Sequence, residues 1–112
     1  MIYHITSEKE WEQCEALDFY APARFDKDGF IHCSAAQQVK RIADTLFRDH
    51  QEVWVLYIDD EEEKEFIKYE NLEGGEELFP HIYHKLPKKS IINRIKVKNS
   101  SMGFRFPGLV TH

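Results

Sequence analysis

The chain has 112 residues, of which 42% are hydrophobic and 13% aromatic, and this composition excludes wholesale disorder and predicts one domain over residues 1–112. No apolar run approaches the roughly 18 residues of a membrane-spanning helix, and no signal-peptide pattern begins the chain, so we expect a cytoplasmic protein without membrane contact. The net charge of −5 argues against a general nucleic-acid binder.

The charges are unevenly distributed along the chain. Residues 1–77 carry all 20 acidic side chains, whereas residues 78–112 carry 7 basic side chains and no acidic one. This basic segment either attracts a phosphate-bearing ligand or offsets the acidic run at residues 59–63. Cys14 and Cys33 form neither a paired metal motif nor a redox motif, and we expect both to be reduced, buried thiols.

The N-terminus predicts a strand followed by a helix. Residues 2–6 form the strand. Ser7 with Glu10 matches a capping box, in which the hydroxyl and the carboxylate satisfy free amides at the start of a helix. We therefore expect a helix from Glu8 to about Leu17.

A second strand and helix follow. Residues 20–28 indicate a loop that ends at Gly29 and leads into a strand at residues 30–33. Ser34 with Gln37 matches a second capping box. Apolar side chains then recur at helical spacing, at Val39, Ile42, Ala43, Leu46 and Phe47.

The rest of the chain predicts strands. The β-branched and aromatic run at residues 53–58 is typical of a strand covered on both faces, and we place it at the centre of the sheet. The acidic residues 59–63 predict either a solvated turn or one short helical turn. Residues 66–70 predict a strand, and Gly74 and Gly75 predict a break.

Two more strands are expected, at residues 78–83 and 91–98. Pro80 cannot donate a ladder hydrogen bond, so we expect an edge position or a bulge there. The tail from residue 99 either packs back through its phenylalanines or frays. Together these elements predict an α+β fold, a small and mostly antiparallel split sheet with two N-terminal helices, and the sequence lacks glycine-rich dinucleotide and phosphate-loop fingerprints.

Three histidines in separate strand-like segments are the main functional signal. His4, His32 and His81 all lie among apolar residues, where a single histidine is more often structural, but three such residues favour a shared site. On a regular strand Phe30, His32 and Ser34 point to one face. Histidine is the side chain best suited to proton transfer near neutral pH, so we take these three as catalytic candidates.

Further polar side chains lie beside the histidines in the sequence. Glu70 is either an exposed strand residue or a carboxylate partner or base, and Tyr3 and Tyr83 are either core aromatics or ligand contacts. The histidine spacing gives no local metal-ligand pair, so we expect no metal. Ser34 lacks the small-residue turn of a nucleophile elbow, which weakens a Ser–His acyl-transfer site.

These segments resemble a bacterial family known only as domain of unknown function 952 (DUF952). The resembling blocks run in order through about residue 98 and are Ile2–Ile5 with Trp11, Gly29–Ser34 with Gln37, Val55–Ile58, Tyr69 with Glu70, and Phe79–Tyr83. One position departs from the pattern, because the family usually places a glycine where this chain has His84. That departure adds a polar side chain near the expected site.

The resemblance implies a compact relative of the ADP-ribosyltransferase fold, which includes the RNA 2′-phosphotransferases, with a cleft that holds NAD or an ADP-ribosyl group. On this analogy His4 and His32 contact the ribose or a phosphate, and Glu70 or His81 stabilises positive charge on the ribose. The implied ligand contacts are Tyr3, Ser34, Gln37, Tyr83 and His84.

The sequence leaves three functional hypotheses open. The first is a transferase or NAD-metabolite-binding protein of the ADP-ribosyltransferase type, with NAD as substrate and a nucleotide, a phosphoribose compound or an RNA end as partner. The second is a non-catalytic binding or regulatory module, because the sequence shows no clear pair of base and nucleophile. Metal-dependent hydrolysis is a third alternative.

Overall fold

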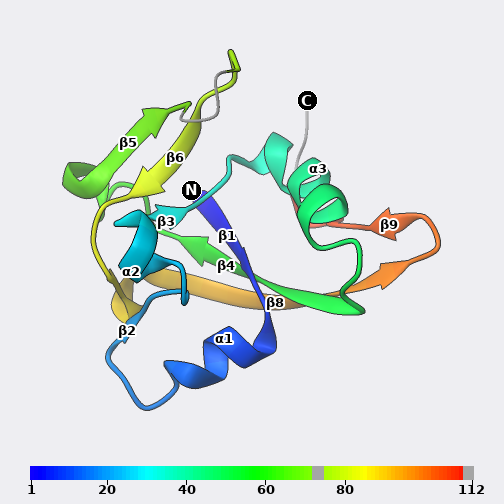
Figure 1. Cartoon of the computed structure of the whole chain (residues 1–112), viewed down its shortest axis with the longest axis horizontal. Helices are drawn as coiled ribbons and strands as arrows, with labels where there is room; N and C mark the ends of the chain where they lie inside the picture. The colour runs from blue at the N-terminus through cyan, green and yellow to red at the C-terminus, as the bar shows by residue number, and fades with distance from the viewer. Residues whose placement is uncertain (72–74, 110–112) are drawn as a thin grey trace.

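The computed structural model describes residues 1–71 and 75–109, and its strands form three antiparallel groups (Figure 1). The first sheet has the order β1 (Ile2–Thr6), β4 (Glu52–Ile58), β8 (Ile91–Ser100) and β9 (Gly103–Phe104). The second has the order β3 (Ile31–His32), β6 (Phe79–Ile82) and β5 (Ile67–Glu70). The third pairs β2 (Phe19–Tyr20) with β7 (Leu86–Pro87). The predicted α+β class with mostly antiparallel strands is confirmed.

Five helical segments connect the strands within the described residues. They are α1 (Glu8–Gln13), α2 (Phe25–Asp28), α3 (Ala36–Leu46) and two 3₁₀ turns, η1 (Lys64–Phe66) and η2 (Lys88–Ser90). None of the helices in this part of the chain is long and apolar enough to cross a membrane.

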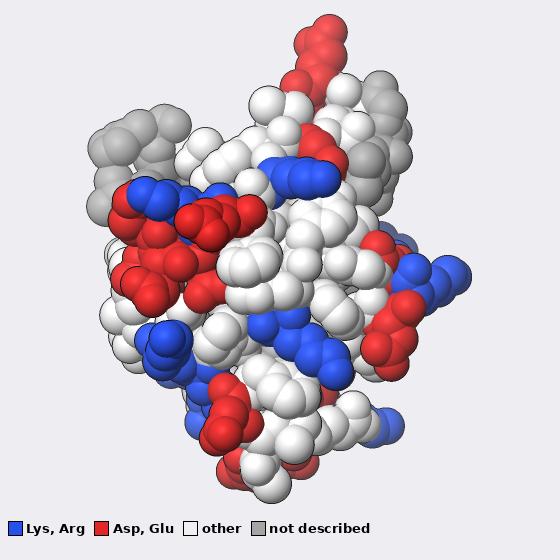
Figure 2. All heavy atoms as spheres, turned by 90° about the vertical axis from the view of Figure 1, so that its left-hand side faces the viewer, with Lys and Arg blue, Asp and Glu red and all other residues white. Residues whose placement is uncertain are grey.

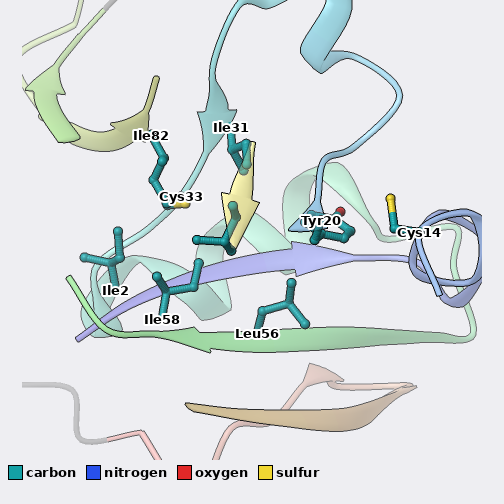
Figure 3. Packing of buried hydrophobic residues seen from close by; sticks show 9 residues of the cluster. Ile2, Cys14, Tyr20, Ile31, Cys33, Leu56, Ile58 and Ile82 are labelled. Carbon is teal, nitrogen blue, oxygen red and sulfur yellow. The ribbon is translucent and has the colours of Figure 1, made fainter. Parts of the chain in front are cut away.

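Strand β4 lies between β1 and β8, as predicted, and separates two groups of buried side chains. Because side chains alternate along a strand, Leu56 and Ile58 point to one face and Val53 and Val55 to the other. The first face packs against the short strands β2, β3, β6 and β7 in the core that Figure 3 shows. The second face packs against α3.

A single β-bridge joins the first two sheets. The amide of Tyr3 donates to the carbonyl of Ser34 at 2.9 Å, and the amide of Ser34 donates to the carbonyl of Tyr3 at 2.7 Å. The chain therefore passes from β3 along the edge of β1 before it enters α3. This path places β3, β1 and α3 around one region of the molecule, where the candidate site lies.

The first predicted helix is shorter than expected. Helix α1 begins after the Ser7 cap, whose hydroxyl accepts from the amide of Glu10 at 3.2 Å, but it ends at Gln13 and not near Leu17. The cause is tertiary, because the Lys88 ammonium donates to the carbonyls of Cys14 (2.6 Å) and Glu15 (3.1 Å) and so satisfies the end of the helix. Both cysteines are free and buried, as predicted.

Residues 20–28 were predicted to form a loop, but part of this segment forms a short strand and a helical turn. Tyr20 is fully buried and pairs with Leu86 in a two-residue strand, too short to produce a periodic pattern. Helix α2 is a single turn, and Gly29 ends it in the left-handed conformation with φ of 79°.

The second capping box is also displaced from its predicted place. The cap of α3 is Ala35 and not Ser34, because the backbone of Ser34 is committed to the bridge with Tyr3. The side chain that reaches back is accordingly Gln38 and not Gln37, and its Oε1 accepts from the amide of Ala35 at 2.9 Å.

Pro80 does not lie at an edge, because β6 is the middle strand of its sheet. Its carbonyl accepts from the amide of Cys33 at 3.0 Å, so the proline nitrogen faces the same side, where β3 has already ended. The missing donor therefore lies opposite Cys33, one residue beyond the β3–β6 ladder, and costs one hydrogen bond at the end of that ladder and none within it.

The C-terminal tail packs back onto the sheet. Strand β8 continues to Ser100, and Phe104 is fully buried against α3. The predicted break at Gly74 and the last three residues, 110–112, lie outside the described residues.

Candidate functional site

A cavity of about 770 Å³ lies between the three-stranded sheet and α3. All four predicted catalytic side chains line it together with Ser34, namely His4, His32, Glu70 and His81. They come from β1, β3, β5 and β6, which the Tyr3–Ser34 bridge holds together. The structure thus brings the predicted catalytic set to one cleft.

His4 is buried and both of its ring nitrogens contact protein groups. Nδ1 donates to the backbone carbonyl of His32 at 2.6 Å, and Nε2 lies 2.9 Å from the hydroxyl of Tyr20. That hydroxyl also bonds Thr6 at 2.8 Å. Burial lowers the pKa of His4 to about 4, with a smaller opposing effect from the His32 carbonyl, so the ring is neutral at pH 7.

His32 is exposed, and its Nε2 lies 3.0 Å from Oδ2 of Asp28. The same oxygen of Asp28 pairs with Arg24 at 3.2 Å. The hydrogen bond to His32, followed by the charge of Arg24, holds the pKa of Asp28 below its usual range. A carboxylate therefore orients the His32 ring from the end of α2.

Glu70 and His81 form a second carboxylate–imidazole pair. Nδ1 of His81 donates to Oε1 of Glu70 at 2.9 Å, and the Tyr83 hydroxyl donates to the same oxygen. The hydrogen bonds from Tyr83 and then His81 lower the pKa of Glu70, which is an anion at neutral pH. Lys68 lies two residues before Glu70 on the same face of β5, and its ammonium is 4.7 Å from the centre of the Tyr83 ring.

The two pairs lie side by side because His32 and His81 are directly opposite each other in the β3–β6 ladder. Their ring centroids are 5.2 Å apart. Phe30 packs against both rings, with centroids 4.6 Å from His32 and 4.3 Å from His81. Packing against this phenylalanine restricts the orientation of both imidazoles.

The opposite wall and the rim of the cleft come from α3 and the segment before β6. Ile42, Leu46 and Phe79 give the lining an apolar part. At the rim the guanidinium of Arg41 pairs with the carboxylate of Glu77. The cleft therefore combines an apolar surface with a few convergent polar groups, as small-molecule sites usually do.

Four of the predicted ligand contacts lie elsewhere among the described residues. Tyr3 packs edge-on against Tyr57 beneath α3, and Gln37 is exposed on the outer surface of that helix. Tyr83 does not line the cleft, but its hydroxyl donates a hydrogen bond to Glu70, which does. His84 stacks on Phe66 with centroids 3.8 Å apart, and its Nε2 pairs with the buried carboxylate of Glu63.

Acidic and basic side chains are intermixed on the face that Figure 2 shows, and several cations of the C-terminal segment contact other parts of the fold. Lys88 caps α1, and Lys96 pairs with Glu52 at 3.6 Å. The guanidinium of Arg94 lies between two tryptophans, 4.6 Å from the ring of Trp11 and 4.1 Å from that of Trp54. These cations have partners within the fold.

No group of three or more His, Cys, Asp and Glu side chains in residues 1–71 and 75–109 is placed to hold a metal ion.

The family described as "Protein of unknown function (DUF952)" matches residues 5–94. The chain belongs to this family. It is also similar to the crystal structure of protein CC0527 from Caulobacter crescentus, with 30% identity, a TM-score of 0.83, and coverage of 96% of this chain and 94% of that one. The solution NMR structure of CC0527 has 32% identity and a TM-score of 0.78 and covers 92% and 89% of the two chains. None of the curated proteins matches.

These DUF952 relatives carry no stated activity, so the ADP-ribosyltransferase relationship stays a prediction. The matched range includes His32, Glu70 and His81. These three residues, which meet at the cleft, therefore all lie in the part of the chain that matches DUF952.

Among the residues that the sequence reasoning missed are Asp28, which contacts His32, and the cleft residues Arg41 and Glu77. Asp28 was assigned to a loop, although its spacing of four residues from His32 across a glycine turn was a usable signal. Arg41 and Glu77 lie 36 residues apart, and nothing in the sequence of this DUF952 chain pairs them.

Proposed function

We propose that the cleft binds a nucleotide that carries a phosphoribose unit, with NAD or an ADP-ribosyl compound as the leading class. The observation that carries this proposal is the pair of carboxylate–imidazole units, His32–Asp28 and His81–Glu70, whose rings lie 5.2 Å apart on one cleft. The cavity volume of about 770 Å³ is within the usual range for small-molecule sites.

The polar groups are suited to a ribose. Both protein donors to Glu70 bond Oε1, which leaves Oε2 to accept from ligand hydroxyls. His32 is exposed and lies opposite, so it can bond a neighbouring hydroxyl or a phosphate oxygen. Two adjacent hydroxyls of one sugar ring would thus meet groups from two neighbouring strands.

The remaining parts of a nucleotide also have matching surfaces. A flat base would pack on the apolar wall formed by Ile42, Leu46 and Phe79. The phosphates would meet guanidinium groups at the rim, which Arg24 and Arg41 supply.

A transferase reaction at this site would use the negative charge of Glu70. When the bond between the ribose carbon and its leaving group breaks, the leaving group takes the electron pair and positive charge develops on the ribose. An ionised carboxylate held in place by His81 and Tyr83 stabilises that charge without having to reorganise. The acceptor then bonds the ribose carbon and gives up its proton, for which the Nε2 of His81 is the base in reach of the cleft.

His4 has a different role in this proposal. Its ring is neutral at pH 7 and its Nδ1 is committed to the backbone of His32. We therefore assign it as a positioning residue that fixes the strand carrying His32.

The test is an NMR titration of the imidazole and amide signals with NAD, ADP-ribose and a ribose 2′-phosphate in parallel. We expect saturable shifts that converge on His32, Glu70 and His81. His32→Ala and Glu70→Gln should each weaken binding at least about tenfold, since each removes a charge-assisted hydrogen bond. The matched control is Glu52→Gln, which changes a carboxylate that pairs with Lys96 on the other sheet. Shifts that avoid the cleft, or equal loss in the control, would overturn the proposal.

A second candidate function is a binding module without catalysis. It is favoured by His4, because a ring with a pKa of about 4 and both nitrogens engaged does not exchange protons at neutral pH. Turnover of NAD or of a phosphorylated RNA end that is lost in Glu70→Gln would exclude it. Binding that remains tight in the wild type without turnover would support it.

A further inference from the structure

The carboxylate of Glu77, at the rim of the cleft, accepts hydrogen bonds from two side chains of α3. The side chain of Glu77, which precedes β6, accepts from the guanidinium of Arg41 through Oε1 and from Nε2 of Gln38 through Oε2 at 3.1 Å. Both donors belong to α3, where Gln38 is buried and Arg41, three residues later, lines the cavity together with Glu77.

These donors form a built site and not a chance surface contact. Gln38 is only 4% exposed, and its amide is fixed at both ends, by the Ala35 amide at Oε1 and by the carbonyl of Leu78 at 2.9 Å from Nε2. The guanidinium of Arg41 presents its donors beside this fixed amide. Gln38 also lies in the first turn of α3, where the helix dipole favours negative charge.

We propose that Arg41 and Gln38 form an anion subsite for a phosphate or pyrophosphate group of the ligand, and that Glu77 is an internal competitor which that group displaces. The proposal rests on the proposed nucleotide function for the identity of the ligand, but the subsite itself is defined by α3. Two oxygens of one phosphate can take the places that the two carboxylate oxygens of Glu77 hold.

The exchange is energetically easy because the pair is partly exposed. The side chains of Arg41 and Glu77 are 56% and 42% exposed, so solvent screens their attraction. Their hydrogen bonds nevertheless lower the pKa of Glu77, Arg41 first and Gln38 second, so the competitor is fully charged at neutral pH. Removing it should tighten anion binding about two- to fivefold, the range for exposed ion pairs.

The experiment measures the affinity of inorganic pyrophosphate and of ADP-ribose by calorimetry at constant ionic strength. Glu77→Gln keeps the size of the side chain but removes its charge and replaces one acceptor oxygen with an amide donor. We expect this variant to bind pyrophosphate about two- to fivefold more tightly than the wild type. Arg41→Gln should weaken the binding, and adding Glu77→Gln to it should then give no gain.

The control for net charge is again Glu52→Gln, which removes one negative charge from a pair with Lys96 outside the cleft. Equal tightening in Glu52→Gln, or a gain from Glu77→Gln that persists without Arg41, would overturn the proposal. If Glu77 only fastens the segment before β6 to α3, Glu77→Gln gives no gain in affinity for pyrophosphate. The absence of a gain would therefore also overturn the proposal.

The same measurements separate this proposal from the nucleotide function. Both proposals are supported if His32→Ala loses its affinity for ADP-ribose while Glu77→Gln, introduced into that variant, still tightens the binding of pyrophosphate. If the pyrophosphate response is present but ADP-ribose never binds, the nucleotide proposal fails and the anion subsite stands.

Discussion

The buried histidine of β1 predicts a pH-dependent stability with a definite sign. In the unfolded chain His4 titrates near its usual pKa of 6.5, whereas in the folded protein burial lowers this pKa to about 4. Between these values the unfolded state binds more protons than the folded state, so the free energy of unfolding rises with pH across the window. The stabilisation is complete above pH 6.5 and is lost as the pH falls to 4.

The size of this effect follows from the two pKa values. One unit of pKa shift corresponds to about 1.4 kcal/mol, and at pH 5 the protonation of the unfolded chain costs the folded state about 2 kcal/mol. Because His4 is only 6% exposed, solvent does not screen the effect appreciably.

The assay is urea unfolding at pH 7 and pH 5 for the wild type and for His4→Gln. The variant is less stable at both pH values, because it loses the contact with Tyr20, but it cannot titrate at this position. We expect the wild type to lose about 2 kcal/mol more than the variant between the two pH values, since all other groups are common to both. Equal losses in the two proteins would refute the reasoning, as would an imidazole signal of His4 that titrates near pH 6.5 in the folded state.

Three further outcomes follow from single contacts. Glu70→Gln should bring the pKa of Tyr83 down from about 12 toward its usual 10, as measured by ultraviolet titration of the phenol, because the hydrogen bond to Glu70 is the main cause of the increase. Phe104→Ala should cost about 3–5 kcal/mol of unfolding free energy, against about 0.5 kcal/mol or less for the exposed Ile92→Ala in the same urea assay. Gly103→Ala should lower the thermal midpoint through a loss of about 1–2 kcal/mol, because Gly103 has φ of 87°. An unchanged midpoint would show that the turn adopts another conformation.

The elements that the sequence predicts well are those whose pattern is local. The β-branched run of β4 and the apolar stripe of α3 each describe one element packed against a layer, and both lie where the patterns place them. The sequence also offers Glu70 as a carboxylate partner, and in the structure it accepts a hydrogen bond from His81.

The elements that the sequence predicts poorly depend on contacts between distant residues. The end of α1 is set by Lys88, more than 70 residues away, and the start of α3 by the bridge between Tyr3 and Ser34. Pro80 lies in a middle strand, but its nitrogen faces Cys33 at the end of the β3–β6 ladder, where one missing bond interrupts no further pairing. None of these contacts can be predicted from the local pattern of apolar and polar residues.

The histidines show how far composition alone leads toward a site. Their shared apolar surroundings group His4, His32 and His81, and the structure does gather them at one cavity. Their environments then divide them, because His4 is enclosed and bonds a backbone carbonyl, whereas His32 and His81 each face a carboxylate. A histidine whose partner is a carbonyl must keep its proton on that nitrogen, so it is a fixed donor and holds the strand in place. A histidine paired with a carboxylate keeps its second nitrogen for a ligand, and this difference assigns structural support to His4 and ligand contact to the other two.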